Sequence, residues 1–358
     1  MKKILFALLA ATMLIGCQEK KDDNVIKIGA ILPLTGSLSE MGKVEQNAML
    51  LAADHLLRDS SETIELIFED NQSNSALATA AANKLLTMDN VDIVISSTTG
   101  ASLAIQPIID RYNVPHVAFC MDTGISSLSK NTIRYYMGLE QEINAILNYI
   151  DKTTTENIGV LCCKIPAYET LVNKYIKPHF TDSQNTLKYI DYYDLNQIDF
   201  RSVALQIKQE NLDKLILLGY GFEYHNIYKQ FVEQNILGDF QILGGWGFLY
   251  TNLDMQLLEG TLVAGPNYVF GTNKLIEEFK QSYFNKNASY PNFDAAFAYE
   301  LVLNIPSLLK MGSDIKNNIA SKKVKSSIVG GYSFDNNGNM LLEKVGMGVY
   351  KSGSIDNL

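Results

Sequence analysis

A hydroxyl-rich turn is the segment of this sequence whose residue types are best suited to binding a ligand. The turn, residues 96–100, follows an apolar run and precedes a helical pattern over 101–112. A helix that begins there presents unpaired N–H groups and the positive end of its dipole, and both favour an anion such as a carboxylate. Thr98, Thr99 and Gly100 are therefore candidate ligand-binding residues. The alternative is that the hydroxyls only cap the helix.

A second turn carries a thiol and an acid. Cys120 and Asp122 follow the apolar run 115–119. A carboxylate at Asp122 would repel a ligand carboxylate but would attract an ammonium group or the hydroxyls of a sugar. The same side chain could instead cap the turn that follows it. Together the two turns predict a site for a small polar ligand, such as an amino acid or an amide, with Asp122 near its ammonium group.

The chain lacks the motifs of common catalytic and nucleotide-binding sites. The segments 219–221 and 245–247 each lack the third glycine of a dinucleotide-binding loop, and no G-x-x-x-x-G-K-[ST] sequence is present. There is no G-x-S-x-G sequence, and the four histidines are scattered without metal-ligand spacing. We therefore expect a protein that is not an enzyme and that holds no cofactor or metal ion.

Strands and helices alternate along the sequence. The apolar run 26–32 is typical of a strand buried on both faces, and a Pro/Gly/Ser turn and an amphipathic helix follow it. Ser37 and Glu40 have the spacing of a capping box for that helix. Helical patterns separate the further predicted strands, which are 64–70, 91–96, 115–119, 133–137, 158–163, 187–193 and 214–218. This alternation predicts an α/β fold with mostly parallel sheets, which bind ligands at the carboxyl ends of their strands.

The N-terminal segment predicts export and anchoring. Two lysines precede the apolar run 4–15, which is too short for the roughly 20 residues of a membrane-spanning helix and is typical of a signal peptide. Residues 14–17, Leu-Ile-Gly-Cys, resemble the lipobox of bacterial lipoproteins. The resemblance implies that 1–16 is a signal peptide, that Cys17 carries lipid, and that 17–24 is a polar tether. The alternative is a plain signal peptide with a coincidental cysteine.

The composition is that of an acidic globular protein. The chain has 358 residues, enough for two domains, and its net charge is −9. An acidic chain without a basic run is a poor nucleic-acid binder, so no nucleic-acid partner is expected. Besides Cys17, the sequence has Cys120, Cys162 and Cys163. This odd number predicts buried thiols, although one disulfide that includes Cys120 stays open in an oxidising compartment.

The opening of the chain resembles that of the periplasmic binding proteins for branched-chain amino acids, which have the type 1 periplasmic-binding fold. The matching residues are Ile26, Lys27, Ile28, Gly29, Pro33, Leu34, Thr35, Gly36 and Gly42. A later segment is similar to the long late helix of that family. It matches through Ala295, Ala296, Ala298, Tyr299 and Glu300. Phe334, Asp335 and Gly338 match the C-terminal hairpin of the family.

The resemblance implies two doubly wound parallel-sheet lobes, between which the chain crosses three times. By the order of the predicted elements, these hinge crossings are expected near Gly138, Pro266 and Lys325. Lobe 1 would then consist of residues 25–137 and 267–325, and lobe 2 of residues 138–266 and 326–358. The ligand would bind between the lobes, where strand ends of both sheets face one another.

On the lobe 1 side, a Ser or Thr in the first turn holds the α-carboxylate of the ligand in that family, and Thr99 matches this position. Cys120 and Asp122 fall where the family often has a small residue followed by Thr, which is a departure from the pattern. Met41, in the first turn of the first helix, matches a position that is often aromatic.

On the lobe 2 side, the resemblance assigns three aromatic residues to the site. Tyr168 and Tyr220 each follow a predicted strand, and Trp246, the one tryptophan of the sequence, lies between glycines. Amino-acid-binding members often carry glutamate at the position of Trp246 to hold the ligand's ammonium group. An indole face can bind a cation, but it supplies no negative charge. Each of the three aromatic residues could instead serve only in packing.

The resemblance implies the solute-binding subunit of an ABC-type importer. We expect a monomeric lipoprotein, held on the cell envelope by lipid on Cys17, that captures a small ligand by domain closure and delivers it to permease subunits in the inner membrane. ATP would be hydrolysed by other subunits. The alternative is an envelope lipoprotein of the same fold that binds and regulates a partner protein instead of feeding a transporter.

Overall fold

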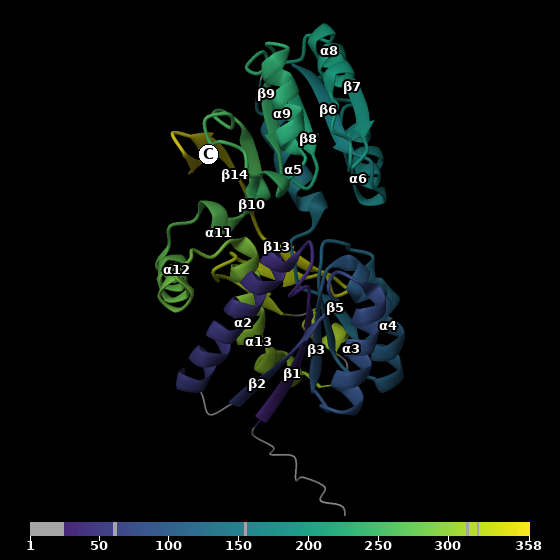
Figure 1. Ribbon diagram of the computed structural model, residues 1–358, viewed down its shortest axis with the longest axis vertical. Helices are drawn as coiled ribbons and strands as arrows, with labels where there is room; N and C mark the ends of the chain where they lie inside the picture. Colours follow the sequence, from purple (N-terminus) through teal and green to yellow (C-terminus); the bar gives the residue numbers. More distant parts are fainter. Residues whose placement is uncertain (1–24, 60–62, 154–155, 313–314, 321) are drawn as a thin grey trace, which may run out of the picture.

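Two α/β lobes lie one above the other in the computed structural model (Figure 1). The structure describes residues 25–59, 63–153, 156–312, 315–320 and 322–358. The predicted signal peptide, Cys17 and the tether lie outside the described residues. None of the described helices is both long enough and apolar enough to span a membrane.

Lobe 1 has a sheet of five parallel strands in the order β2-β1-β3-β4-β5. Its strands are β1 (Val25–Leu32), β2 (Thr63–Asp70), β3 (Ile93–Ser97), β4 (His116–Phe119) and β5 (Thr132–Arg134). Its helices are α2 (Ser39–Asp59), α3 (Ser75–Thr87), α4 (Thr99–Tyr112), α12 (Lys274–Asn287), α13 (Phe293–Leu309) and α14 (Ile315–Ile319). Side chains alternate along β1, so that Ala30 and Leu32 join one core with α2 and α13, whereas Ile31 joins a second core with α3 and α4. This two-sided burial explains the continuous apolar run of the strand.

Lobe 2 has a seven-stranded sheet in the order β15-β14-β10-β9-β8-β6-β7. The parallel strands are β6 (Asn157–Cys163), β7 (Thr186–Tyr193), β8 (Lys214–Leu218), β9 (Gln241–Gly244) and β10 (Leu262–Pro266). At one edge, β14 (Val345–Lys351) and β15 (Ser354–Asn357) run antiparallel. The helices are α5 (Leu139–Ile150), α6 (Pro166–Leu171), α7 (Lys177–His179), α8 (Arg201–Gln209), α9 (Tyr224–Glu233), α10 (Gly247–Tyr250) and α11 (Asn267–Phe270). A π-helical turn, Val172–Ile176, joins α6 to α7.

The start of α2 differs from the expectation. The helix begins at Ser39, so Ser37 lies outside it and Glu40 is its second residue, and the expected capping box does not form. The turn before the helix is held by Asp70 instead. Asp70 accepts hydrogen bonds from the backbone N–H groups of Leu34 (2.9 Å) and Thr35 (3.2 Å) and from the Thr35 hydroxyl. Although desolvation opposes it, these bonds lower the pKa of Asp70.

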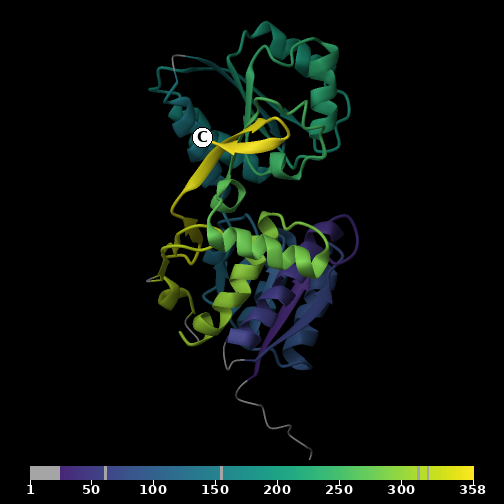
Figure 2. The same ribbon diagram turned by 90° about the vertical axis from the view of Figure 1, so that its left-hand side faces the viewer.

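The third crossing between the lobes lies later in the chain than the sequence suggested. A small sheet of β11 (Lys323–Val324), β12 (Tyr332–Phe334) and β13 (Met340–Leu342) packs into the core of lobe 1, since Tyr332 and Met340 are fully buried there. The chain therefore crosses to lobe 2 between β13 and β14, not near Lys325 (Figure 2). Residues 326–342, which were expected in lobe 2, belong to lobe 1. The other crossings lie between β5 and α5 and after β10.

Arg134, fully buried at the end of β5, ties two of these crossings together. Its Nε donates to Asn339 Oδ1 (3.0 Å), while its two terminal nitrogens donate to the carbonyls of Tyr136 (2.7 Å) and Met340 (3.2 Å). Tyr136 lies in the first crossing, and Met340 directly precedes the third. The guanidinium is also 3.5 Å from the carbonyl of Cys120, in the turn after β4. Burial lowers the pKa of Arg134, and surrounding acids oppose that change.

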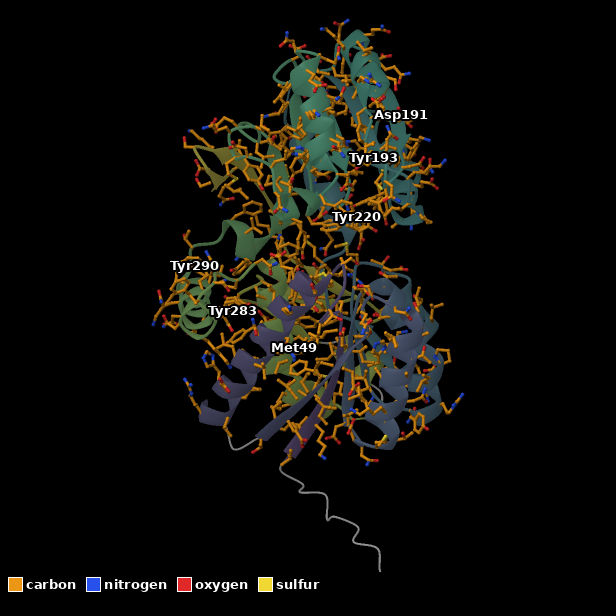
Figure 3. The ribbon with its side chains drawn as sticks, in the orientation of Figure 1. Met49, Asp191, Tyr193, Tyr220, Tyr283 and Tyr290 are labelled. Atoms are coloured by element: carbon orange, nitrogen blue, oxygen red, sulfur yellow. The ribbon has the colours of Figure 1, made fainter. Side chains whose placement is uncertain are left out.

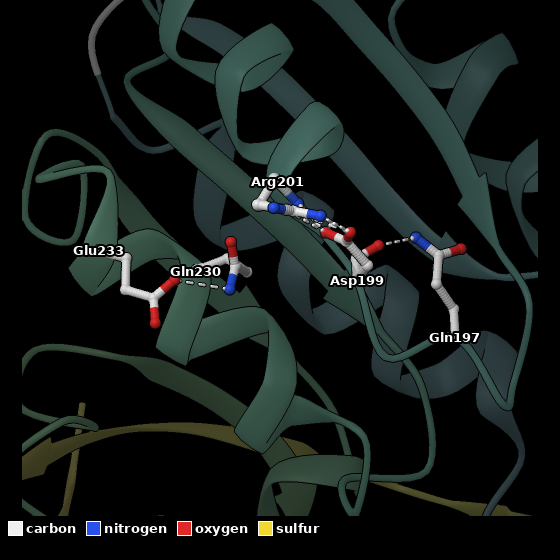
Figure 4. Close-up of polar contacts among 5 residues, drawn as sticks. All are labelled: Gln197, Asp199, Arg201, Gln230 and Glu233. Carbon is white, nitrogen blue, oxygen red and sulfur yellow. Dashed lines mark hydrogen bonds and ion pairs between the residues drawn. The ribbon is translucent and has the colours of Figure 1, made fainter.

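We expect Arg134→Met to lower the free energy of unfolding by about 2 kcal/mol or more, because the buried carbonyls of Tyr136 and Met340 would each lose a hydrogen bond at about 1–3 kcal/mol, whereas Asn339 keeps the Ser126 hydroxyl as a donor. Urea unfolding, followed by circular dichroism, measures the change. Arg201→Met is the matched control, because Arg201 is exposed and its partner is the exposed Asp199 (Figure 4). An unfolding midpoint that is equal in the two variants would contradict the tying role of Arg134.

Candidate ligand-binding site

The carboxyl ends of β3 and β4 form the lobe 1 half of the site. Ser97 pairs with Phe119 in the sheet, so the turns that follow the two strands lie side by side. Thr98 caps α4, with its hydroxyl 3.5 Å from the N–H of Ala101, and has φ of 77°. A β-branched residue in that backbone region is strained, and strain of this kind concentrates at ligand-binding sites. Thr99 is the first residue of α4, so the turn carries the free amides that the sequence predicted.

Cys120 lies directly against this turn. Its thiol is buried and interacts with the Thr99 side chain. Burial raises the pKa of Cys120 to about 11, so the thiol is neutral at physiological pH and carries no charge that would repel an anion. Cys120, Cys162 and Cys163 are all buried free thiols, as expected.

Asp122 makes the capping bond that was its alternative role. Its Oδ1 accepts a hydrogen bond from the backbone N–H of Gly124 at 2.8 Å, and the residue is exposed. Met41 is half-buried in the first turn of α2. Neither position gives a contact that assigns a ligand role, so both assignments stay predictions.

A chain of buried polar side chains supports the turn from below. Ser96 Oγ is 2.7 Å from Ser102 Oγ and 2.8 Å from His116 Nε2, and His116 Nδ1 is 2.9 Å from Thr132 Oγ1. Burial lowers the pKa of His116 to about 3, so its ring is neutral. The chain links the ends of β3, β4 and β5 to the first turn of α4, and the role of His116 is therefore structural.

Two buried acids lie behind the same turn. Glu45 accepts a hydrogen bond from Ser97 Oγ at 3.0 Å, and Asp294 accepts one from the Tyr136 hydroxyl at 2.6 Å. The second oxygen of each acid makes no hydrogen bond with any described residue. Burial and the charge of Asp294 raise the pKa of Glu45, and burial raises the pKa of Asp294 to about 7. The pair therefore favours a state in which it holds a proton.

On the lobe 2 side, two Gly-aromatic-Gly turns pack back to back. A Cβ on Gly247 would lie 2.4 Å from the carbonyl oxygen of Gly219, and one on Gly221 would lie 2.0 Å from the carbonyl oxygen of Gly247. Gly221 also has φ of 98°. Glycine at these positions thus serves close backbone packing, which brings the rings of Tyr220 and Trp246 edge to face at 5.5 Å.

The third predicted aromatic residue joins this group. Tyr168 is buried, its hydroxyl donates to the carbonyl of Gly219 at 2.9 Å, and its ring meets that of Tyr220 at 6.4 Å. The structure thus brings Tyr168, Tyr220 and Trp246 together at the carboxyl ends of β6, β8 and β9. Tyr220 lies where the two lobes meet (Figure 3).

Two buried acids that sequence reasoning missed position these turns. Glu223 accepts hydrogen bonds from the Tyr220 N–H (2.7 Å) and the Tyr193 hydroxyl (2.9 Å). Glu142, from the first turn of α5, accepts a hydrogen bond from the backbone N–H of Trp246 at 3.0 Å. Burial raises the pKa of Glu142 well above its ordinary value, and that hydrogen bond opposes the rise. An acid three residues after Tyr220 was the one signal in the sequence for Glu223.

Aromatic contacts continue from this group into lobe 1. Trp246 meets Tyr250 at 5.4 Å, and Tyr250 meets Phe293 of α13 at 5.3 Å. Trp246 also belongs to the same apolar cluster as Phe119 of β4. No group of three or more acidic, histidine or cysteine side chains suited to a metal ion occurs in the described part of the chain.

Comparisons with known proteins agree with this geometry. A family model described as periplasmic binding protein matches residues 25–322. The fold is similar to that of the branched-chain amino acid transporter substrate-binding protein LivJ from Streptococcus pneumoniae in complex with isoleucine, with a TM-score of 0.78 and 21% identity, covering 93% of this chain and 99% of that one. It is also similar to a solute-binding protein of an ABC transporter from Rhodopseudomonas palustris in complex with 3,4-dihydroxybenzoic acid, with a TM-score of 0.79 and 18% identity, covering 94% and 97%. An amino acid ABC transporter substrate-binding protein from Pseudomonas fluorescens has a TM-score of 0.81 and 14% identity, covering 93% and 95%.

The buried Asp294 predicts a pH dependence of stability. Its pKa in the folded protein is about 7, whereas an unfolded Asp titrates near pH 4. Between these values the folded state binds a proton that the unfolded state has lost, so the free energy of unfolding falls as pH rises from about 4 to about 7. Asp294→Asn, which keeps an acceptor for Tyr136, should make the slope in that window shallower, and Glu300, whose pKa burial also raises to about 7, accounts for part of the slope that is left.

Urea unfolding at intervals of pH measures this effect. Asp239→Asn, at an exposed position of lobe 2, is the control and should keep the wild-type slope. If the free energy of unfolding of Asp294→Asn fell with pH as steeply as that of the wild type, the carboxyl group of Asp294 would not be the cause of the pH dependence.

Proposed function

The chain belongs to the periplasmic binding protein family, and from that premise we propose that it is the solute-binding lipoprotein of an ABC-type importer. Members of this family are extracytoplasmic solute-binding proteins and not enzymes. The proposed cargo is a small molecule with a carboxylate, bound between the lobes. The observation that carries the proposal is the start of α4, where the backbone of Thr98 is strained and the first amides of the helix are available to an anion.

The electrostatics of lobe 1 support a carboxylate at this turn. The N-terminus of α4 contributes a partial positive charge. The buried guanidinium of Arg134 lies 3.5 Å from the carbonyl of Cys120 in the neighbouring turn, and the oxygens that accept its hydrogen bonds are uncharged. The ligands of two structurally similar proteins, isoleucine and 3,4-dihydroxybenzoic acid, share a carboxylate and little else. Since two otherwise different ligands of this fold both carry a carboxylate, we infer that the cargo of this chain carries one too.

The mechanism that we infer is capture by closure about the crossings. The lobe 1 turn offers donors to an anion, and the lobe 2 turns offer aromatic surface, so a ligand that touches both favours the closed form. Tyr250 of lobe 2 meets Phe293 of lobe 1, and Phe293 meets Tyr136 of the first crossing at 6.4 Å, so this contact between the lobes lies close to a crossing, where closure changes distances least. Permease subunits in the inner membrane would recognise the closed form and ATP-binding subunits would supply the energy, while this chain acts as a monomer anchored through Cys17.

We expect Thr99→Val to weaken the binding of a carboxylate ligand by about tenfold or more, since a hydrogen bond to a charged group is lost while the side-chain volume is kept. A thermal-shift panel of amino acids, amides and aromatic and short-chain acids finds the ligand, and calorimetric titration then measures the dissociation constant. Thr87→Val, at the exposed end of α3, is the matched control.

The panel also separates the two functions left open by the sequence. A ligand that stabilises the protein and binds Thr99→Val more weakly supports the solute-binding role. If nothing in the panel shifts the melting temperature and the protein copurifies from membranes with a cell-wall enzyme or a receptor, the regulatory role replaces it.

Lipid attachment has a direct measurement. Mass spectrometry of the protein purified from its native membranes should show a mature chain that begins at Cys17 and is heavier than the polypeptide by several acyl chains. An N-terminus at another residue, or an unmodified Cys17, would contradict the anchor.

A further inference from the structure

An exposed aromatic ring extends the lobe 2 half of the site. Phe222 is 60% exposed, although burying a Phe side chain is strongly favourable in water. Its ring stacks on that of Tyr220, with centroids 6.0 Å apart and planes at 26°. Because Tyr220 also contacts Tyr168 and Trp246, the four rings form one continuous group, and Phe222 is its most exposed member.

The backbone holds this surface in place before any ligand binds. Phe222 lies in the turn between β8 and α9, next to Gly221, whose positive φ and close approach to Gly247 allow no other residue without strain. Glu223 accepts a hydrogen bond from the backbone N–H of Tyr220 and so fixes the turn on the side opposite Gly221. A preformed stack of this kind does not lose side-chain entropy on binding, and it offers a flat apolar face.

The two acids that contact the lobe 2 turns are both buried, so neither is exposed to an ammonium group. Trp246 occupies the position at which the resemblance implied a glutamate. Glu142 and Glu223, the acids beside the turns, are buried, and each accepts a backbone N–H. On lobe 1, Asp122 accepts the N–H of its own turn. An α-ammonium group at the lobe 2 turns would therefore lose hydration without contacting an exposed carboxylate there.

We propose that Tyr168, Tyr220, Phe222 and Trp246 form a ring-binding surface, and that the cargo is an aromatic carboxylate without an α-ammonium group. This inference rests on the proposed solute-binding function. The carboxylate would bind at the start of α4, and the ring would stack on Phe222 and Tyr220. The hydroxyl of Tyr220, which makes no hydrogen bond with a described residue, is half-buried and available to a hydroxyl or carbonyl substituent on the ring.

The test is a titration with carboxylates that differ in having a flat ring and in having an ammonium group. Benzoate, 4-hydroxybenzoate and 3,4-dihydroxybenzoate are compared with cyclohexanecarboxylate, which lacks the flat ring, and with phenylalanine and leucine, which carry the ammonium group. Trp246, the one tryptophan of the sequence, reports binding near the ring surface through its fluorescence, and calorimetry gives the dissociation constants. We expect at least one aromatic acid to bind at least about tenfold tighter than the other three compounds.

Phe222→Ala should weaken the binding of the aromatic acid by about tenfold, whereas Tyr290→Ala should leave it unchanged. Tyr290 is the matched control, because it is 75% exposed and its ring contacts Phe284 at 4.7 Å, away from the junction of the lobes (Figure 3). Both positions are exposed, so neither substitution empties a core.

Binding of leucine or phenylalanine in preference to every aromatic acid would overturn the inference and leave the solute-binding function intact. Equal binding by Phe222→Ala and the wild type would overturn the role of the ring surface. If none of the six compounds binds, the inference fails, and the wider thermal-shift panel decides separately whether the solute-binding function also fails.

Discussion

The architecture of this protein depends on one buried cation. Arg134 has no carboxylate among its direct hydrogen-bond acceptors, and it replaces its lost hydration with an amide oxygen and backbone carbonyls. Those acceptors come from segments about 200 residues apart in sequence. A buried charge is tolerated only where its acceptors are held in place, so Arg134 fixes the first crossing, the segment before the third crossing and the turn after β4 relative to one another. The turn after β4 and the crossings are thus parts of one polar network.

The two halves of the site are built on different principles. In lobe 1, the turn after β3 rests on hydroxyls, a neutral imidazole and two acids, and what it offers to a ligand is backbone polarity. In lobe 2, glycines let two turns approach each other closely, and what these turns offer is aromatic surface. A molecule with a charged end and a flat apolar end matches this division. In lobe 2, Glu142 and Glu223 accept backbone N–H groups of these same turns.

The local pattern of apolar residues predicted most of the helices and strands. Contacts between distant segments decided to which lobe a segment belongs and how a turn is held. The strands of both lobes are continuous apolar runs, so their positions follow from burial on two faces. The segment with Tyr332 and Met340 has an alternation that would suit either lobe, and only its packing into the lobe 1 core assigns it. Likewise, the Ser-x-x-Glu spacing at Ser37 suggested a cap, but Asp70, more than thirty residues away, organises that turn.

For the site, the sequence placed Tyr168, Tyr220 and Trp246 at strand ends, and the structure brings their rings into contact. Glu142 and Glu223 escaped notice because an acid that serves a distant backbone N–H has no periodic signature. Phe222 lies in the turn before α9, which begins at Tyr224. The exposure of its ring depends on the turn geometry imposed by Gly221, and no local pattern reports that.

Both lobes are discontinuous, and this has a consequence for biogenesis. Lobe 1 cannot complete its core until β12 and β13 are available, and lobe 2 cannot complete the edge of its sheet until β14 and β15 are available. A polypeptide that emerges N-terminus first therefore completes neither lobe before these strands have emerged. A chain whose last strands are not yet available stays unfolded and can pass through a narrow translocation pore. Its folding is completed in the compartment that receives these strands.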